Sequence, residues 1–129
     1  MVEGNVQLEY IQKLVSSKIV VIAQRDEWED HYRLMESLAS GALVMTDSML
    51  AAPAGLKNKT NVIVYDSPAS LKRLIRYYLK HNTKRREIAK KGFELAVGRH
   101  RAWHRIEEVL FGRPLTHVDV PFQKMSKKE

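Results

Sequence analysis

With 129 residues, 44% of them hydrophobic and 29% charged, the chain is long enough for one domain with a modest core, and this balance excludes an intrinsically disordered protein. It contains no cysteine, which excludes disulfides, thiolate catalysis and cysteine metal sites. No apolar run approaches the roughly 18 residues that a membrane helix requires. The first residues also lack the basic and apolar regions of a signal peptide, so we expect a cytoplasmic protein.

The net charge of +7 is concentrated in one part of the chain. Residues 72–105 contain 12 basic and 2 acidic residues, a balance of +10, whereas residues 1–71 contain 6 basic and 9 acidic residues, a balance of −3. A basic helical face of this kind is able to bind nucleic acid, acidic lipid or an acidic protein. The alternative is a solvated helix surface without a partner.

The chain opens with a helix and a strand. Apolar residues recur at helical spacing between residues 7 and 17, which predicts a helix whose apolar face is made of Leu8, Ile11, Leu14 and Val15. The segment 18–23, KIVVIA, is a continuous run rich in β-branched residues. It predicts a strand buried on both faces, as in a parallel sheet.

A loop, a helix and a second strand follow. The acidic loop 26–30 ends in a residue suited to cap a helix, and the helical pattern runs from about His31 until Gly41 ends it. Residues 42–46, ALVMT, form a second apolar strand.

Residues 48–60 form a connecting loop in which we expect a short helical turn around residues 49–50, and residues 61–65 form a third strand. Ser67 and Pro68 then begin a helix, because serine caps well and proline fits the first helical position.

Three helices complete the pattern. We expect the first to end at residues 81–82, Thr83 to cap the second and Gly98 to end it. The last helix spans about residues 101–111, and Gly112 stops it.

Alternating helices and strands predict an α/β fold. Residues 1–112 form a partial Rossmann-type domain, a short parallel sheet flanked by helices, and residues 113–129 form a partly disordered tail. A doubly wound nucleotide-binding sheet has about six strands and carries its phosphate loop after the first. Here only three strands are evident and neither GxGxxG nor Walker A occurs, so the chain corresponds to the second half of such a unit.

Arg33 and Glu36 lie three residues apart and therefore share one helical face. Arg33 is in the first turn, where free backbone N–H groups and the helix dipole favour an anion. A ligand with phosphates and a ribose would place its phosphates at the helix start and its hydroxyls against Glu36. The alternative is an Arg–Glu ion pair on a solvated face.

Residues 33–47, RLMESLASGALVMTD, resemble the RxxE…A-x-G-[AG]-x-x-x-x-[TD] segment of group 1 glycosyltransferases. The resemblance continues through VIVYDS at 62–67, the apolar spacing of 71–79, RREIA at 85–89 and the stretch from His100 to Arg105. It covers about residues 7–111 and is specific as an ordered set. It points to the C-terminal, donor-binding half of a GT-B enzyme, nearest to the spore-maturation-type (CgeB-like) branch.

This resemblance implies a nucleotide-sugar substrate, such as a UDP- or GDP-sugar, with no cofactor and no bound metal. Helix N-termini and basic side chains would offset the charge of the pyrophosphate. By the same resemblance, Glu36 binds the ribose hydroxyls, and Arg33 with the backbone around His31 and Tyr32 faces the diphosphate.

The catalytic residues stay open. Retaining relatives carry a second glutamate eight residues before the ribose-binding one, and this chain has Trp28 there. Glu27 and Glu29 flank that position, and one or neither of them replaces the missing carboxylate. Trp28 either stacks on a sugar or base, or covers the core. The donor sugar, the acceptor and the retaining or inverting outcome cannot be named from the sequence.

Histidines offer a further set of candidates. His100 and His104 have the i, i+4 spacing of metal ligands on a helix, but neighbouring arginines favour packing or exposure, and we expect no metal site. His31, at a helix start, is the histidine that we link to a ligand.

Two functional hypotheses follow: a glycosyltransferase donor domain, or a non-catalytic module whose basic helices in 72–105 bind a protein partner or nucleic acid. The resemblance leaves out the acceptor half and the front of the donor half, so we expect no transferase activity from this chain alone. It is then a fragment, one piece of a split enzyme, or a retained fold with a new task. The missing strands also predict an exposed sheet edge, covered by an N-terminal half, another subunit or self-association.

Overall fold

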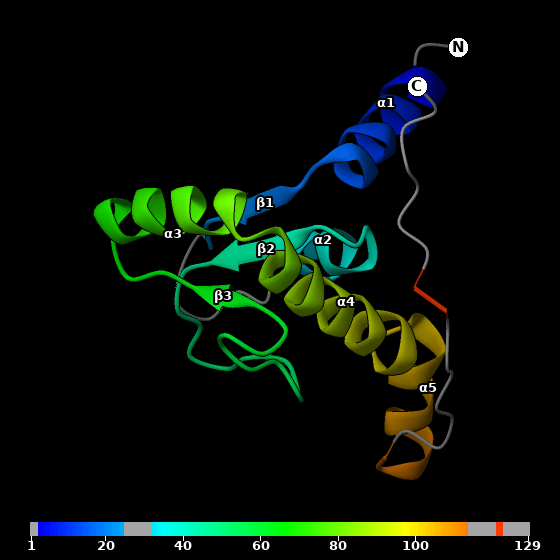
Figure 1. The fold of residues 1–129 in the computed structure, drawn as a ribbon. Helices are drawn as coiled ribbons and strands as arrows, with labels where there is room; N and C mark the ends of the chain where they lie inside the picture. Colours follow the sequence, from blue (N-terminus) through cyan, green and yellow to red (C-terminus); the bar gives the residue numbers. More distant parts are fainter. Residues whose placement is uncertain (1–2, 25–31, 114–120, 123–129) are drawn as a thin grey trace.

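The structure is a computed structural model that describes residues 3–24, 32–113 and 121–122, with side chains from residue 7 onward. Its elements in chain order are α1 (Glu3–Ser16), β1 (Ile19–Ile22), α2 (Tyr32–Ala39), β2 (Leu43–Thr46), β3 (Ile63–Val64), α3 (Pro68–Lys80), α4 (Asn82–Arg99) and α5 (Ala102–Phe111). They form a short parallel sheet flanked by helices (Figure 1), which confirms the predicted α/β, Rossmann-like fold.

The sheet has the strand order β1-β2-β3, with both pairs parallel. Side chains along β2 alternate between two cores, as the pleat of a strand requires. Val44 points to a cluster with Leu34 and Leu38 of α2. Leu43 and Met45 point to a second cluster on the other face, built with residues of β3, α3 and α4: Ile63, Tyr78, Ile88 and Ala89.

Burial on both faces is confirmed for β2, whose four residues are all buried, but the same prediction is wrong for β1. Val21 is 43% exposed, and Ile19 and Val20 are only half-buried. β1 lies at the edge of the sheet, and within the described residues no strand pairs with its outer side. The β-branched run therefore predicted a parallel strand correctly, but it did not indicate whether other strands pair with both of its sides.

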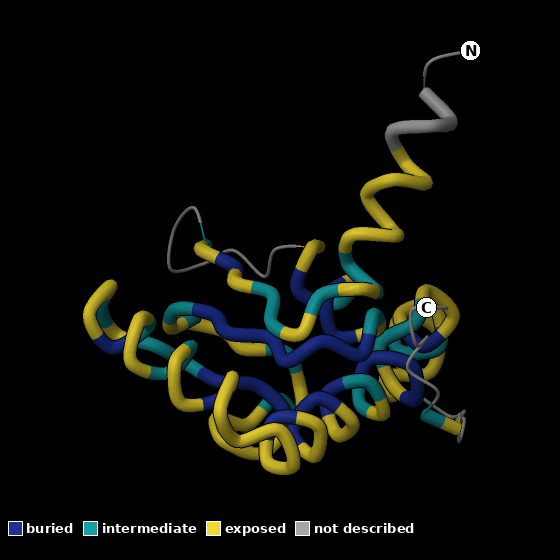
Figure 2. Tube along the Cα trace, turned by 45° about the horizontal axis from the view of Figure 1, so that its top comes forward, coloured by how far each residue is buried: buried dark blue, intermediate teal, exposed yellow. Residues whose placement is uncertain are grey.

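β1 also borders a hollow of about 450 Å³. Its walls come from the end of α1, from β1 and from α3: Ser16, Ser17, Lys18, Ile19, Val21, Ile75 and Leu79. α1 projects away from the body beside it (Figure 2), so Leu8 and Ile11 of its apolar face are exposed. Among the described helices, none is long and apolar enough to cross a bilayer.

Local signals set several helix ends as predicted. The Ser67 hydroxyl accepts the backbone N–H of Ser70 at 3.2 Å, and the Ser70 hydroxyl accepts that of Ser67 at 3.2 Å, so a capping box begins α3 with Pro68 as its first residue. Gly112 ends α5 in the left-handed region, at φ 72°.

Other predicted boundaries are wrong. α4 begins at Asn82, so Thr83 lies inside the helix; the preceding residue, His81, already closes α3, with Nδ1 2.7 Å from the Tyr77 carbonyl oxygen. α4 also continues through Gly98 to Arg99. One glycine lowers helix stability by only about 1 kcal/mol, which is less than packing contributes.

The segment between β2 and β3 forms no helical turn at residues 49–50, and β3 is shorter than the predicted 61–65. Before β3, Asn58 and Val62 form an isolated bridge. The Asn61 side chain accepts the Lys57 N–H at 2.7 Å and donates to the Gly55 carbonyl at 2.9 Å. These hydrogen bonds fix a turn where apolar content alone predicted a strand.

Part of the predicted tail contacts the body. The Phe122 ring packs edge-on against Phe93 of α4, with ring centroids 5.3 Å apart. The same ring lies beside Gly41, where an added Cβ would come within 2.9 Å of it. The other residues of the tail, 114–120 and 123–129, lie outside the described part, so the domain boundary at residue 112 stays a prediction.

Gly92 lets α4 approach the turn before β3. A Cβ there would lie 2.6 Å from the Asn61 carbonyl oxygen and 2.8 Å from Leu38 Cδ2. Asn61 is buried and held by two hydrogen bonds of its side chain, so its backbone cannot move aside easily.

We therefore expect Gly92→Ala to lower the free energy of unfolding by about 1–3 kcal/mol, because the new methyl group overpacks this contact. Helix propensity alone would act in the opposite direction, by up to about 1 kcal/mol. Urea denaturation measures the difference. Lys91→Ala, at an exposed position of the same helix, is the control and should stay within about 0.5 kcal/mol of the wild type. A Gly92→Ala variant as stable as the wild type would contradict the close approach.

Candidate functional site

The carboxyl ends of the parallel strands meet at one edge of the sheet, and polar residues follow them directly. Asp47, after β2, accepts the backbone N–H of Gln24, after β1, at 3.0 Å to Oδ1 and 3.2 Å to Oδ2. The Gln24 side-chain amide donates to the Thr46 hydroxyl at 3.2 Å. Thr46 is fully buried and its hydroxyl lies 3.4 Å from Asp47 Oδ1. These contacts tie the ends of β1 and β2 together.

Tyr65, which directly follows β3, connects this strand to the end of β1 at the same edge of the sheet. Its hydroxyl donates to the Ile22 carbonyl oxygen at the end of β1, at 2.9 Å. Burial, and secondly the negative charge of Asp47, raise the pKa of Tyr65 above its usual value. In open α/β sheets, ligands bind in the crevice outside the carboxyl ends of the strands, so this edge is the place to look for a site.

α2 presents Glu36 at its surface. Leu34, Ser37 and Leu38 are buried and hold the helix on the sheet, whereas Glu36 is exposed. The Tyr10 hydroxyl of α1 donates to Glu36 Oε2 at 2.8 Å. Burial, followed by the hydrogen bond and charge of Glu36, raises the pKa of Tyr10. The carboxylate is thus oriented by a residue that sequence reasoning did not identify.

Tyr32 and Arg33 form the start of α2, and both are exposed. The Arg33 guanidinium carbon lies 5.7 Å from the centroid of the Tyr32 ring. The first turn of α2 contains no acidic residue, so its N-terminal dipole and the Arg33 charge both favour an anion. Residues Glu27, Trp28, Glu29 and His31, the remaining candidates from the sequence, lie outside the described residues.

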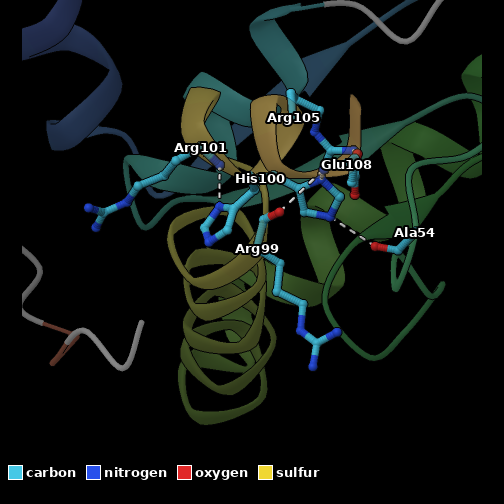
Figure 3. A network of polar contacts seen from close by, with 7 residues as sticks. Ala54, Arg99, His100, Arg101, Arg105 and Glu108 are labelled. Atoms are coloured by element: carbon cyan, nitrogen blue, oxygen red, sulfur yellow. Dashed lines mark hydrogen bonds and ion pairs between the residues drawn. The ribbon is translucent and has the colours of Figure 1, made fainter. Parts of the chain in front are cut away.

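The paired histidines serve the fold (Figure 3). His104 is fully buried in the first turn of α5; its Nδ1 accepts the backbone N–H of Arg101 at 3.0 Å, and the Trp103 indole nitrogen lies 3.2 Å from its Nε2. A neutral imidazole has one acceptor nitrogen, and we assign it to Nδ1. His100 Nε2 lies 2.9 Å from the Ala54 carbonyl oxygen, and the Arg105 guanidinium contacts its Nδ1.

His100 and His104 are therefore engaged by separate partners rather than aimed at a common point. Within the described residues, no group of three or more histidine, cysteine, aspartate or glutamate side chains could hold a metal ion.

Sequence reasoning named Arg33 and Glu36 but gave no role to Gln24 or Asp47. One signal was available: both directly follow strands predicted to be parallel, and the carboxyl ends of such strands share an edge. Tyr10 carried no such signal, because its contact with α2 spans 26 residues and depends on the direction in which α1 leaves the sheet.

The model of a protein family described as glycosyl transferase-like matches residues 4–110. The chain belongs to this family. The match runs from α1 to α5 and therefore includes Tyr10, Glu36 and Asp47. A glycosyltransferase-related role follows from it. Searches of the curated proteins and of the solved structures gave no match.

This glycosyl transferase-like chain also presents a basic surface on α3. Lys72, Arg73, Arg76 and Lys80 are all exposed, and α3 contains no acidic residue. On α4 the charges are partly balanced, since Lys91 lies 3.0 Å from Glu87 and Lys90 lies 3.7 Å from Glu94. The positive charge predicted for residues 72–105 is thus shared between α3 and α4, with a balance of +4 on each, and α3 carries its share without acidic residues.

The contact between Tyr10 and Glu36 gives a pH-dependent prediction. Glu36→Gln removes the negative charge, so we expect the pKa of Tyr10 to fall toward its ordinary value of 10.0, with burial keeping part of the shift. NMR titration of ¹³C-labelled tyrosine measures it, and Glu9→Gln, a neutralised carboxylate next to Tyr10 in sequence, is the control that should leave it unchanged.

A raised pKa keeps Tyr10 protonated in the folded chain while tyrosine ionises in the unfolded chain, so folding stability falls as pH rises through about 10. This decrease in folding stability with rising pH should be smaller in Glu36→Gln than in the wild type. A Tyr10 pKa that is the same in wild type and Glu36→Gln would contradict the hydrogen bond.

Proposed function

We propose that the chain is the donor-binding part of a glycosyltransferase and takes a nucleotide-sugar outside the carboxyl edge of its sheet. The observation that carries this proposal is Glu36, an exposed carboxylate on the surface of α2 that the Tyr10 hydroxyl orients. Membership of the glycosyl transferase-like family supports it.

In this proposal Glu36 accepts hydrogen bonds from the ribose hydroxyls. A carboxylate has about four acceptor positions, so the bond from Tyr10 to Oε2 leaves capacity for a diol. The Tyr10 hydroxyl limits the rotation of the carboxylate and lowers the entropic cost of binding.

The diphosphate would lie against the first turn of α2, where Arg33 adds a positive charge. Backbone N–H groups at a helix start point toward such an anion, and the first turn of α2 contains no acidic residue. The site needs no metal in this scheme, because helix and arginine offset the charge of the pyrophosphate.

Asp47 has a positioning role in the same proposal. Its two oxygens hold the backbone N–H of Gln24, the last described residue before the segment 25–31. That segment carries Glu27, Trp28, Glu29 and His31, the candidates for contact with the sugar and phosphates. Asp47 therefore fixes the point from which this segment leaves the sheet.

We infer that the domain is a C-terminal half of GT-B type, nearest to the spore-maturation-type branch. The acceptor would then come from an N-terminal half or another subunit. The exposed edge of β1, with its hollow, supports a further polypeptide segment beside the sheet, which would complete the crevice.

Calorimetric titration with UDP and GDP tests the proposal. We expect one of them to bind and Glu36→Ala to weaken it by about ten- to hundredfold, because charge-assisted hydrogen bonds contribute on the order of 1.5–3 kcal/mol. Tyr10→Phe should weaken it less, since the carboxylate remains. Glu94→Ala, on α4, is the matched control. The proposal fails if neither nucleotide binds, or if Glu36→Ala binds the nucleotide as tightly as the wild type.

We also expect the chain alone to transfer no sugar. Without an acceptor half, no interdomain cleft forms around the donor. The measurement is release of UDP or GDP from UDP-glucose or GDP-mannose over many hours, compared with buffer. Transfer above that background by the purified chain would contradict this expectation.

The outer side of α3 favours a second candidate function, an interaction module that binds nucleic acid or an acidic protein. Its four cations are exposed, and none forms an ion pair with another described residue. Phosphate contacts weaken steeply with salt, whereas a pocketed nucleotide depends on Glu36. A DNA or RNA affinity that falls by orders of magnitude between low and high salt, and is unchanged by Glu36→Ala, would favour the second function.

A further inference from the structure

α5 turns its apolar side toward solvent. The residue that faces the body is His104, which is fully buried, and Glu107 and Glu108 flank it half-buried. The large apolar residues of the helix are instead exposed, by 41% at Trp103, 58% at Ile106, 86% at Val109, 67% at Leu110 and 61% at Phe111. This is a contiguous group within ten residues, unlike the scattered single exposures of ordinary surfaces.

Polar contacts hold α5 in this orientation (Figure 3). The Arg101 backbone N–H donates to His104, which caps the helix start, and Arg105 contacts both His100 and Glu108. These bonds attach the histidine side of the helix to the end of α4. The apolar side is left outward as a consequence.

Arginines precede and follow this helix. Arg99 and Arg101 extend away from the helix start (Figure 3), and Arg113 follows the helix end. The Arg101 guanidinium carbon lies 4.7 Å from the centroid of the Trp103 ring. Residues 99–113 contain four arginines and two glutamates, a balance of +2, and they continue from the basic helix α4.

We propose that α5 binds the surface of an anionic lipid bilayer, lying flat with Trp103, Ile106 and Leu110 among the acyl chains. An exposed apolar helix face with a tryptophan and flanking arginines is the pattern of interfacial membrane helices. A second copy of the chain would bring two basic regions together, so the charge favours an anionic surface over self-pairing. This proposal does not rest on nucleotide binding.

Co-sedimentation of the full chain with lipid vesicles tests it, using phosphatidylcholine alone and phosphatidylcholine with one quarter phosphatidylglycerol. We expect binding to the anionic vesicles and little to the neutral ones. Ile106→Ser/Leu110→Ser should weaken binding by about tenfold or more, because two apolar side chains no longer leave water. Arg99→Gln should weaken it by about fivefold.

The matched control is Leu8→Ser/Ile11→Ser, which removes two exposed apolar residues from α1 and should bind like the wild type. Circular dichroism confirms that each variant is folded. Absence of binding, equal binding to both kinds of vesicle, or α5 variants that bind like the control would each overturn the proposal. So would light scattering that shows a dimer, together with a disulfide between copies of an Ile106→Cys variant, since the chain has no other cysteine.

Discussion

Burial of β2 on both faces is the constraint on which the rest of the structure depends. All four of its residues are buried, and Leu43, Val44 and Met45 contribute to two separate cores, one under α2 and one under α3 and α4. Full burial of one such apolar side chain contributes about 1.5–3 kcal/mol, and only helices on both sides of the strand provide it. The neighbouring strands then pair in parallel with β2, which places their carboxyl ends, and the polar residues after them, at one edge.

The candidate site combines two kinds of contact. The first kind joins the ends of the strands to one another and follows from their parallel register. It is made by Asp47, Gln24, Thr46 and Tyr65. The pairing of Tyr10 with Glu36 joins two helices instead. The first set gives the edge a fixed shape, and the second sets the direction of the Glu36 carboxylate. A donor site proposed here therefore depends on the fold of the whole domain.

Much of the fold was predictable because its signals are local. The continuous apolar run at β2, the serine and proline before α3 and the glycine after α5 each specify one element or one end, and the structure confirms them. The local sequence signals gave wrong predictions where packing against residues distant in the sequence determines the structure. Gly98 stays inside α4 although glycine breaks helices, and Val21 is exposed although its strand composition predicts burial. For the site, spacing placed Arg33 and Glu36 at the start of one helix, but no local pattern indicates that Tyr10 meets Glu36.

The hydrogen bond between Tyr10 and Glu36 has a consequence for how α1 and the site communicate. α1 is an arm with an exposed apolar face, and this bond joins it to the carboxylate of α2. Anything that binds α1 more tightly in one orientation changes how well the carboxylate is presented, and a ligand on the carboxylate must change the affinity of α1 for that partner by the same factor. Binding of a partner to α1 and binding of a ligand to the Glu36 carboxylate would then be thermodynamically coupled through the Tyr10 hydroxyl.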